Sequence, residues 1–203
     1  MKVRAGALAL GLAVVVAGPV AAQGHAGHGA DHQDMHAAPP ATGLRAELIR
    51  DVEQLERKYM GLARAMTGKY DWRPAEGVRS AGEVFGHVAG ANFMIPSMAG
   101  VSVPESMAAS SMQEGMRRMR ELERSGDEAR ILESLEHSFR HATHALADVS
   151  DAQLEEQTKM FGQDVTKRQV LTLLVMHMHE HLGQAIAYAR MNGVTPPWSE
   201  GGN

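Results

Sequence analysis

The longest periodic segment of the chain covers residues 166–193, and it constrains the fold more than any other stretch. Successive residues of an α-helix are rotated by roughly 100°, so His177 and His181 lie about 40° apart, on the same side as the apolar Leu174. His179 falls on the opposite side, which a soluble helix turns to water. The segment therefore predicts a long amphipathic helix with two histidines turned into the protein and one turned out.

Two imidazoles one helical turn apart can bind the same metal ion, because this spacing brings both ring nitrogens within reach of one point. The other interpretation is that His177 and His181 are two core histidines, each hydrogen-bonded to a neighbour. The pair alone does not decide between these two interpretations.

Three other segments also repeat apolar residues with helical spacing, and their ends are marked by familiar signals. The first is expected to end near Gly68. The second begins at a capping box formed by Ser80 and Glu83, and the third begins at the capping residue Asp127. Residues 150–164 are expected to be a connection before the last helix. Four amphipathic segments without an alternating strand pattern predict an all-α protein, a four-helix bundle over residues 43–198.

Length and composition fit one domain with a real core and some extensions, since 44% of the 203 residues are hydrophobic. The net charge is -4, and without a basic excess we expect no nucleic-acid partner. The chain contains no cysteine, which excludes disulfides, thiolate metal ligands and a cysteine nucleophile.

Residues 1–22 have the pattern of a secretory signal peptide. A short basic start precedes an apolar run over residues 5–16, and residues 20–22 supply the small-x-small site that signal peptidase recognises. We expect cleavage after Ala22, export to the periplasm or the medium, and no membrane attachment afterwards. The alternative is a retained anchor, although the apolar run is short for a membrane span.

Residues 23–42 are rich in Gly, Ala, His and Pro and are expected to be a disordered His-rich linker. The tract could loosely bind Cu(II), zinc or nickel through neutral imidazoles, or it could simply be a polar spacer. Its histidines recur every three or four residues: His25, His28, His32 and His36. At the other end of the chain, residues 199–203 form a short tail.

Two further stripes on expected helices resemble metal sites. Met112, Met116 and Met119 could bind Cu(I) through their thioethers, but methionine is also an adaptable core filler, and we favour that role. A second stripe lies on the third long helix, about 190° from the centre of its apolar seam, so we expect it to be exposed and solvated. It consists of His137, His141 and His144.

His87 lies about 60° from Val84, at the edge of the apolar face of the second long helix, and is expected to face inward. Taken singly, an inward histidine is more often structural than a metal ligand. The interpretation of His87 as a metal ligand is favoured only if it lies close to His177 and His181.

The chain resembles the DinB superfamily of four-helix bundles over residues 43–198. Three features carry this resemblance: Val78-Arg79-Ser80 leading into Glu83 and His87, the pair His177 and His181 followed by Gly183-Gln184, and the ending Tyr188-Ala189-Arg190-Met191-Asn192-Gly193-Val194-Thr195-Pro196-Pro197. The last two form a His-x-x-x-His-x-Gly-Gln motif with a Tyr-x-Arg-x-x-Gly-x-x-Pro-Pro tail. Relatives often carry two adjacent histidines where this chain has Glu180-His181.

The resemblance implies a divalent metal ion, zinc or nickel, bound by His87, His177 and His181. Three histidine ligands leave coordination positions open, as in catalytic sites. Some relatives are thiol-dependent transferases or isomerases, and activation of water for hydrolysis is the other option. Glu180, on a flank of the last helix, is a weak candidate for a general base. The resemblance further implies a small-molecule substrate and a homodimer.

A different class of function is also open. The His-rich linker and the methionine stripe together suggest a periplasmic protein that binds or handles copper or zinc. A helical bundle that retains its metal site without turnover is a third reading.

Overall fold

The computed structural model describes residues 40, 42–109 and 112–199. The predicted signal peptide, nearly all of the His-rich linker with its four histidines, and residues 200–203 of the tail lie outside this part. Four long helices make up a bundle: α1 (Gly43–Ala65), α2 (Ala81–Ser97), α4 (Glu128–Asp148) and α5 (Lys167–Met191). The predicted helical architecture is therefore confirmed.

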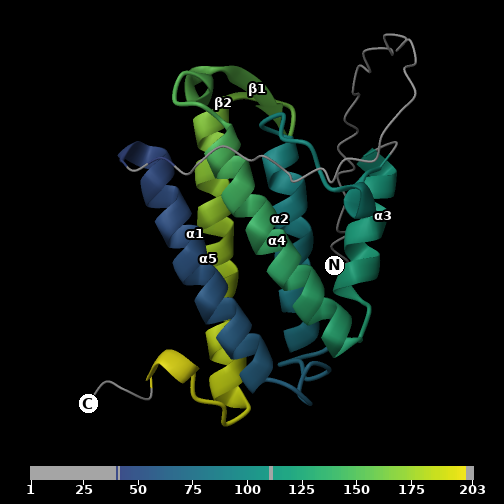
Figure 1. The fold of residues 1–203 in the computed structure, drawn as a ribbon. Coiled ribbons are helices and arrows are strands. Elements are labelled where there is room, and N and C mark those ends of the chain that lie inside the picture. Colours follow the sequence, from purple (N-terminus) through teal and green to yellow (C-terminus); the bar gives the residue numbers. More distant parts are fainter. Residues whose placement is uncertain (1–39, 41, 110–111, 200–203) are drawn as a thin grey trace, which may run out of the picture.

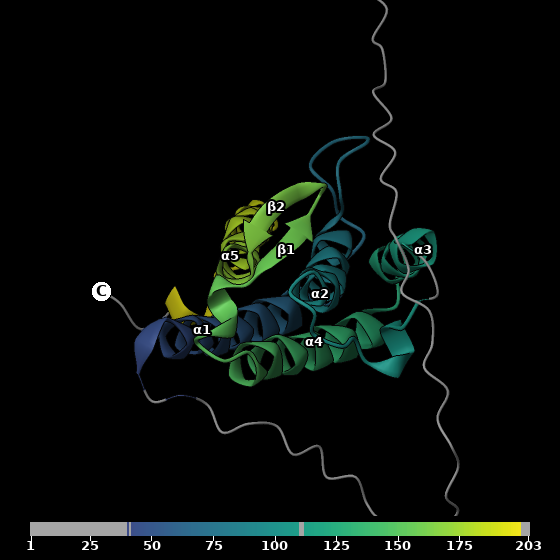
Figure 2. The same ribbon diagram turned by 90° about the horizontal axis from the view of Figure 1, so that it is seen from above.

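The four bundle helices are arranged in two layers, with α1 and α4 in one and α2 and α5 in the other (Figures 1 and 2). Each helix turns its apolar stripe toward the centre, as amphipathic helices must when they share a core. Val84 is buried, as expected for the apolar face of α2, and so is most of the rest of this helix, because α3 packs against it from outside the bundle. The core is centred on aromatic and aliphatic side chains with almost no exposure, among them Tyr59, Phe85, Phe139, Leu55, Leu135 and Leu174.

The predicted helix starts are also confirmed. The Ser80 side chain accepts a hydrogen bond from the Glu83 amide, while the Glu83 carboxylate accepts one from the Ser80 amide. The same reciprocal box, formed by Thr166 and Gln169, opens α5. Each such cap satisfies amides that the first helical turn leaves unpaired and stabilises the helix by about 1 kcal/mol.

A fifth helix, α3 (Met112–Glu123), lies outside the bundle and packs beside α2 (Figure 2). Its Met119 is buried against Gly90, where the side-chain Cγ lies 3.2 Å from the position that a Cβ would take. Met119 thus has the filler role that the sequence favours, whereas Met116 is exposed. The side chain of Met112 lies outside the described residues.

The predicted connection before the last helix contains a two-stranded antiparallel hairpin, which the sequence analysis missed. Strands β1 (Gln157–Met160) and β2 (Gln163–Thr166) pair with each other beside the start of α5 (Figure 1). Both central residues of the turn have positive φ, 50° at Phe161 and 80° at Gly162, as a tight hairpin turn requires. The strands have four residues each and bury neither face fully, so they leave no alternating apolar pattern to recognise.

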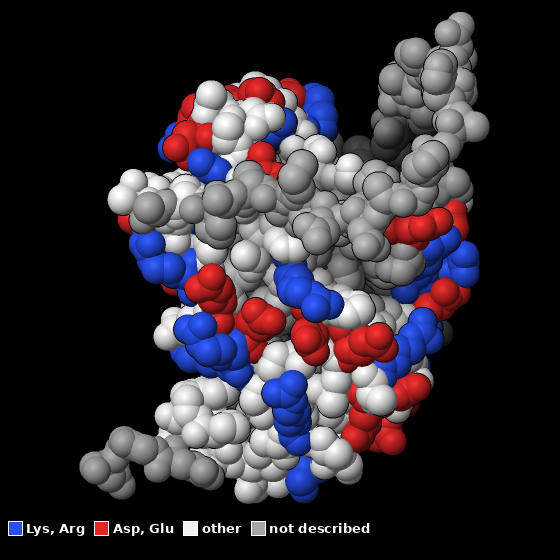
Figure 3. Space-filling model, viewed as in Figure 1, with Lys and Arg blue, Asp and Glu red and all other residues white. Residues whose placement is uncertain are grey.

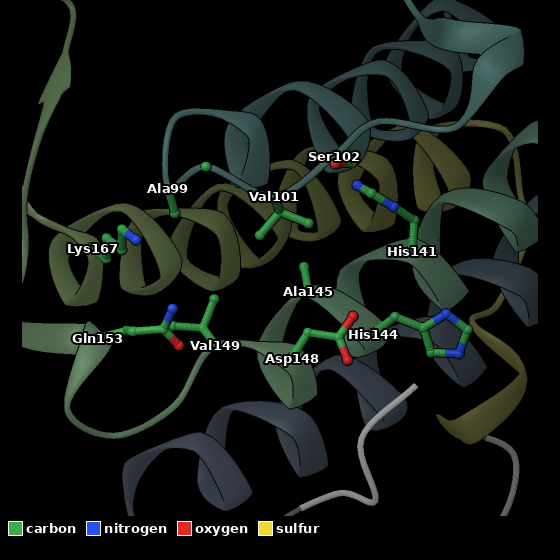
Figure 4. Close-up of a pocket in the computed structure, with 11 residues that line it drawn as sticks. Ala99, Val101, Ser102, His141, His144, Ala145, Asp148, Val149, Gln153 and Lys167 are labelled. Atoms are coloured by element: carbon green, nitrogen blue, oxygen red, sulfur yellow. The ribbon is translucent and has the colours of Figure 1, made fainter. Parts of the chain in front are cut away.

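The prediction for the histidine stripe on α4 is only partly right. His137 is exposed, but His141 and His144 are half-buried, and the His141 ring lies 5.4 Å from that of Phe93. Both line a pocket of about 310 Å³ together with Ser102 and Lys167 (Figure 4). Val101 and Ser102, from the segment that follows α2, line the same pocket, an arrangement that the helical wheel of α4 alone cannot reveal.

None of the helices in the described part of the chain combines the length and apolarity that crossing a membrane requires. On the face shown in Figure 3, Lys and Arg side chains are interspersed with Asp and Glu side chains. This face therefore presents no continuous field of one sign.

Candidate metal centre

Three histidines that are far apart in the sequence meet between α2 and α5. His87 comes from the second turn of α2, and His177 and His181 come from the middle of α5. Each offers one ring nitrogen, and these nitrogens all lie within 4.8 Å of one another. Among the described His, Asp and Glu side chains, this is the one group of three or more with such proximity. We call it the histidine triad.

The distances within the triad suit a single metal ion. The Nε2 atoms of His87 and His177 lie 3.2 Å apart. Two nitrogens that bind the same tetrahedral zinc ion at about 2.0–2.1 Å are separated by about 3.3 Å. The ring centroids of His177 and His181 are 4.5 Å apart, and that of His181 lies 4.8 Å from that of His87. The three rings thus surround one point.

Gln184 orients the ring of His181. Its amide nitrogen donates to the Tyr188 hydroxyl at 3.0 Å. Its carbonyl oxygen then faces His181 Nδ1 at 2.8 Å and accepts the N–H from that nitrogen. The tautomer of His181 that satisfies this contact carries its proton on Nδ1 and leaves Nε2 with a free lone pair.

The ring of His87 has a carboxylate on its other side. Its Nδ1 lies 3.4 Å from Oε2 of Glu123, slightly longer than an ordinary hydrogen bond. The other oxygen of Glu123 accepts a 2.7 Å hydrogen bond from Nε of Arg79. This arrangement favours the tautomer of His87 that has its proton on Nδ1 and its lone pair on Nε2, facing His177.

Burial favours the uncharged forms of His177 and His87. The pKa of His177 is lowered to about 4, mainly by burial and to a smaller extent by His181, His87 and Arg79. The pKa of His87 is also lowered, mainly by burial and then by the Arg79 guanidinium and His181. Because metal ions bind the neutral imidazole, these rings need no proton loss before they can act as ligands.

The donor set fits a late first-row metal ion. Three imidazole nitrogens suit zinc, nickel or copper, whereas magnesium and calcium prefer oxygen ligands. The three residues named by the sequence analysis are the three that the structure brings together. His179 is exposed on the other side of α5, as expected, and Glu180 is also exposed.

Two charged residues of the site were not identified from the sequence. Glu123 is the last residue of α3, and it lies within a run of charged residues that resembles any solvated helix end. Arg79 precedes the cap of α2 and was noted only as part of a motif. Their roles depend on how α3 packs against α2, which no local pattern encodes.

Gly86 allows α3 to come this close. A Cβ at Gly86 would lie 2.8 Å from Cα of Glu123 and 3.0 Å from the carbonyl oxygen of Leu122. Both contacts are with backbone atoms, so an added methyl group must push α3 away from α2. The absence of a side chain at this one position brings Glu123 to the triad.

We expect Gly86→Ala to destabilise the protein by about 1–3 kcal/mol, the usual cost of overpacking a close contact. Urea unfolding followed by circular dichroism measures this free energy. The matched control is Gly183→Ala on α5, where a Cβ has nothing within 4 Å and alanine is the better helix former. Equal stabilities for the two variants would contradict the steric role of Gly86.

Comparison with known proteins agrees with this geometry. No curated protein and no solved structure gave a match to this chain. The sequence model of the DinB superfamily matches residues 51–185, a stretch that contains all three histidines of the triad. Since this match covers more than half of the sequence, the chain belongs to the DinB superfamily.

Proposed function

We propose that this protein is an exported metal-dependent enzyme that acts on a small molecule, with His87, His177 and His181 as its metal ligands. The observation that carries the proposal is the 3.2 Å separation of the Nε2 atoms of His87 and His177, beside a third imidazole. Two imidazole nitrogens whose lone pairs face each other at this distance repel each other, unless a cation lies between them or one nitrogen carries a proton.

An enzymatic role is supported by the number of ligands and by the exposure of the site. Three protein ligands leave coordination positions open, whereas structural zinc sites use four. All three histidines are only partly buried, so the triad is not sealed from solvent. A divalent ion, zinc or nickel, held there supplies Lewis acidity to a group that binds at its open positions.

The reaction class follows from the family resemblance and from the carboxylates near the triad. Thiol transfer and hydrolysis are the two candidates that the resemblance suggests. Glu180 is exposed, and Glu123 is already engaged by Arg79 and His87, so neither offers an unengaged carboxylate at the site. This supports a nucleophile that is activated by the metal ion rather than by a general base.

Export is proposed from the sequence of residues 1–22, and the bundle is proposed to act in the periplasm after cleavage. A homodimer is proposed from the resemblance alone. Sedimentation of the mature protein tests the dimer, and N-terminal sequencing of that protein tests cleavage after Ala22.

Metal analysis of the mature protein, expressed with its signal, tests the central proposal. We expect one tightly bound ion per chain and a lower melting temperature after chelation, because an ion that binds only the folded state stabilises it. Adding back the free ion at about 100 times its Kd should restore about 2.7 kcal/mol. A screen for thiol adducts and ester hydrolysis then follows on the loaded protein.

Deletion of residues 23–42 is the control for metal handling by the His-rich linker. The proposal requires that the tightly bound ion stays with the bundle after this deletion. Several weakly bound ions that disappear with the linker would favour a copper- or zinc-handling protein instead.

A further inference from the structure

Helix α3 lies outside the four-helix bundle, yet its last residue contacts the histidine triad. Glu123 is only 16% exposed, and its two oxygens face two different partners. One oxygen accepts a hydrogen bond from Nε of Arg79 at 2.7 Å, and the other lies 3.4 Å from Nδ1 of His87. The hydrogen bond from Arg79 therefore holds the carboxylate with its second oxygen facing His87.

We propose that Glu123 is a positioning residue of the metal centre, and that Arg79 holds Glu123 in place. This inference rests on the proposed function, because it assumes that the triad binds a metal ion. If this inference is correct, α3 contributes a residue to the metal centre in addition to packing against the bundle.

The ring of His87 needs a hydrogen-bond partner at Nδ1 if Nε2 is to bind the metal ion. An imidazole that binds metal through Nε2 must carry its proton on Nδ1, and a partner for that N–H fixes both the tautomer and the rotation of the ring. Glu123 is the group within reach of Nδ1. For His181 the same task is performed by Gln184, from the same helix.

The carboxylate of Glu123 is held by Arg79, which lies on a different segment of the chain. Arg79 lies just before the cap of α2, His87 lies two turns along the same helix, and Glu123 arrives from α3. The three side chains therefore connect the start of α2, the triad and the end of α3. Gly86 brings the two backbones into contact beside this connection, because a Cβ there would lie only 2.8 Å from Cα of Glu123.

Glu123 differs in its exposure and in its partners from the nearest other acidic residue of α3. Glu121, two residues earlier, is 54% exposed and pairs with the exposed Arg117 at 2.6 Å. Exposed pairs of this kind are screened by water and salt and contribute little. Glu123 is shielded from solvent and faces the interior of the site, so its charge acts on His87 with less screening.

The arrangement also couples metal binding to the docking of α3. If Glu123 strengthens binding at His87, a bound ion must strengthen the contact between α3 and α2 by the same free energy. Metal loading should therefore slow amide hydrogen exchange in α3 as well as in α2 and α5.

The test compares Glu123→Gln with the matched control Glu121→Gln, using Co(II) as the probe. Dissociation constants come from competition with a chelator, and the visible absorption bands of bound Co(II) report the ligand geometry. We expect Glu123→Gln to weaken Co(II) binding by about 10–100-fold, the usual effect of losing a partner of a metal-binding histidine. Its absorption bands should shift, while Glu121→Gln should match the unaltered protein.

Arg79→Gln is the second variant and does not alter the carboxylate itself. We expect a smaller loss of Co(II) affinity, and little further loss when it is combined with Glu123→Gln, because the two residues act through the same contact. Glu123→Asp, which keeps the charge, should recover part of the affinity. Melting curves without metal verify that each variant is folded.

Equal affinity and equal spectra for Glu123→Gln and Glu121→Gln would overturn the inference. Additive losses in the double variant would overturn the role of Arg79. Failure of the proposed function has a different signature, because the unaltered protein would then bind Co(II) no better than His177→Ala does.

Discussion

Replacing His177 with alanine is expected to abolish tight metal binding while leaving the bundle folded. The substitution removes one of three ligands, including the Nε2 atom that lies 3.2 Å from that of His87. Loss of a partner of a ligand costs about 10–100-fold in metal affinity, so we expect loss of the ligand itself to cost more than about 100-fold. Isothermal titration with Zn(II) or Ni(II) measures the change.

The fold should tolerate this change because His177 is not a satisfied core residue. Its Nδ1 is buried and has no hydrogen-bond partner in the described part of the chain. Removing an unpaired polar group from a buried position offsets part of the packing that is lost with the ring. Stability of the metal-free protein should therefore change little.

His179→Ala is the matched control, since it removes an exposed imidazole two residues away on the same helix. We expect its affinity to equal that of the unaltered protein. An equal loss in both variants would show that the ion binds elsewhere on α5. Retention of stoichiometric metal in His177→Ala would rule out the triad as the site.

The second large effect is expected in the core, at Tyr59 on α1. Its side chain is completely buried, with ring centroids 5.5 Å from Phe139 and 6.5 Å from Phe85. Its hydroxyl donates a 2.7 Å hydrogen bond to the carbonyl of Met178, the residue that follows His177. Tyr59 thus joins the two layers of the bundle beside the triad.

Tyr59→Ala should lower the free energy of unfolding by about 3–5 kcal/mol, the range found for truncating buried aromatic residues. Domains of this kind have a total of about 5–15 kcal/mol, so the loss is a large share of the stability. Tyr59→Phe keeps the ring and should cost only about 0.5–1.5 kcal/mol. Urea unfolding of the pair separates the ring from the hydroxyl, and equal losses would assign the effect to the hydrogen bond alone.

Several parts of this structure could be predicted because short-range patterns determine them. The boxes at Ser80 and Thr166 specify helix starts through contacts three residues apart. His177 and His181 share a face because their spacing is close to one helical turn. His87 lies on the apolar side of α2, so packing of α2 against α5 brings it to the pair.

Other parts depend on contacts between distant segments and could not be predicted. The strands of the hairpin are too short and too exposed to show an apolar alternation. His141 and His144 line a pocket together with the segment after α2, although the helical wheel of α4 places them on its outer side. Glu123 reaches the triad only because Gly86 lets α3 approach, and the sequence marks neither residue as functional.

A polar pair in the core has a consequence for the alignment of the helices. Asn92 on α2 donates to the Ser138 hydroxyl on α4 at 3.1 Å, and that hydroxyl donates to the Leu135 carbonyl at 2.7 Å. Both residues are completely buried. If α2 slid by one turn along α4, the amide would be stranded among apolar side chains, at a cost of about 1–3 kcal/mol. This one hydrogen bond therefore disfavours misaligned packings of α2, the helix that carries His87, against α4 in the other layer of the bundle.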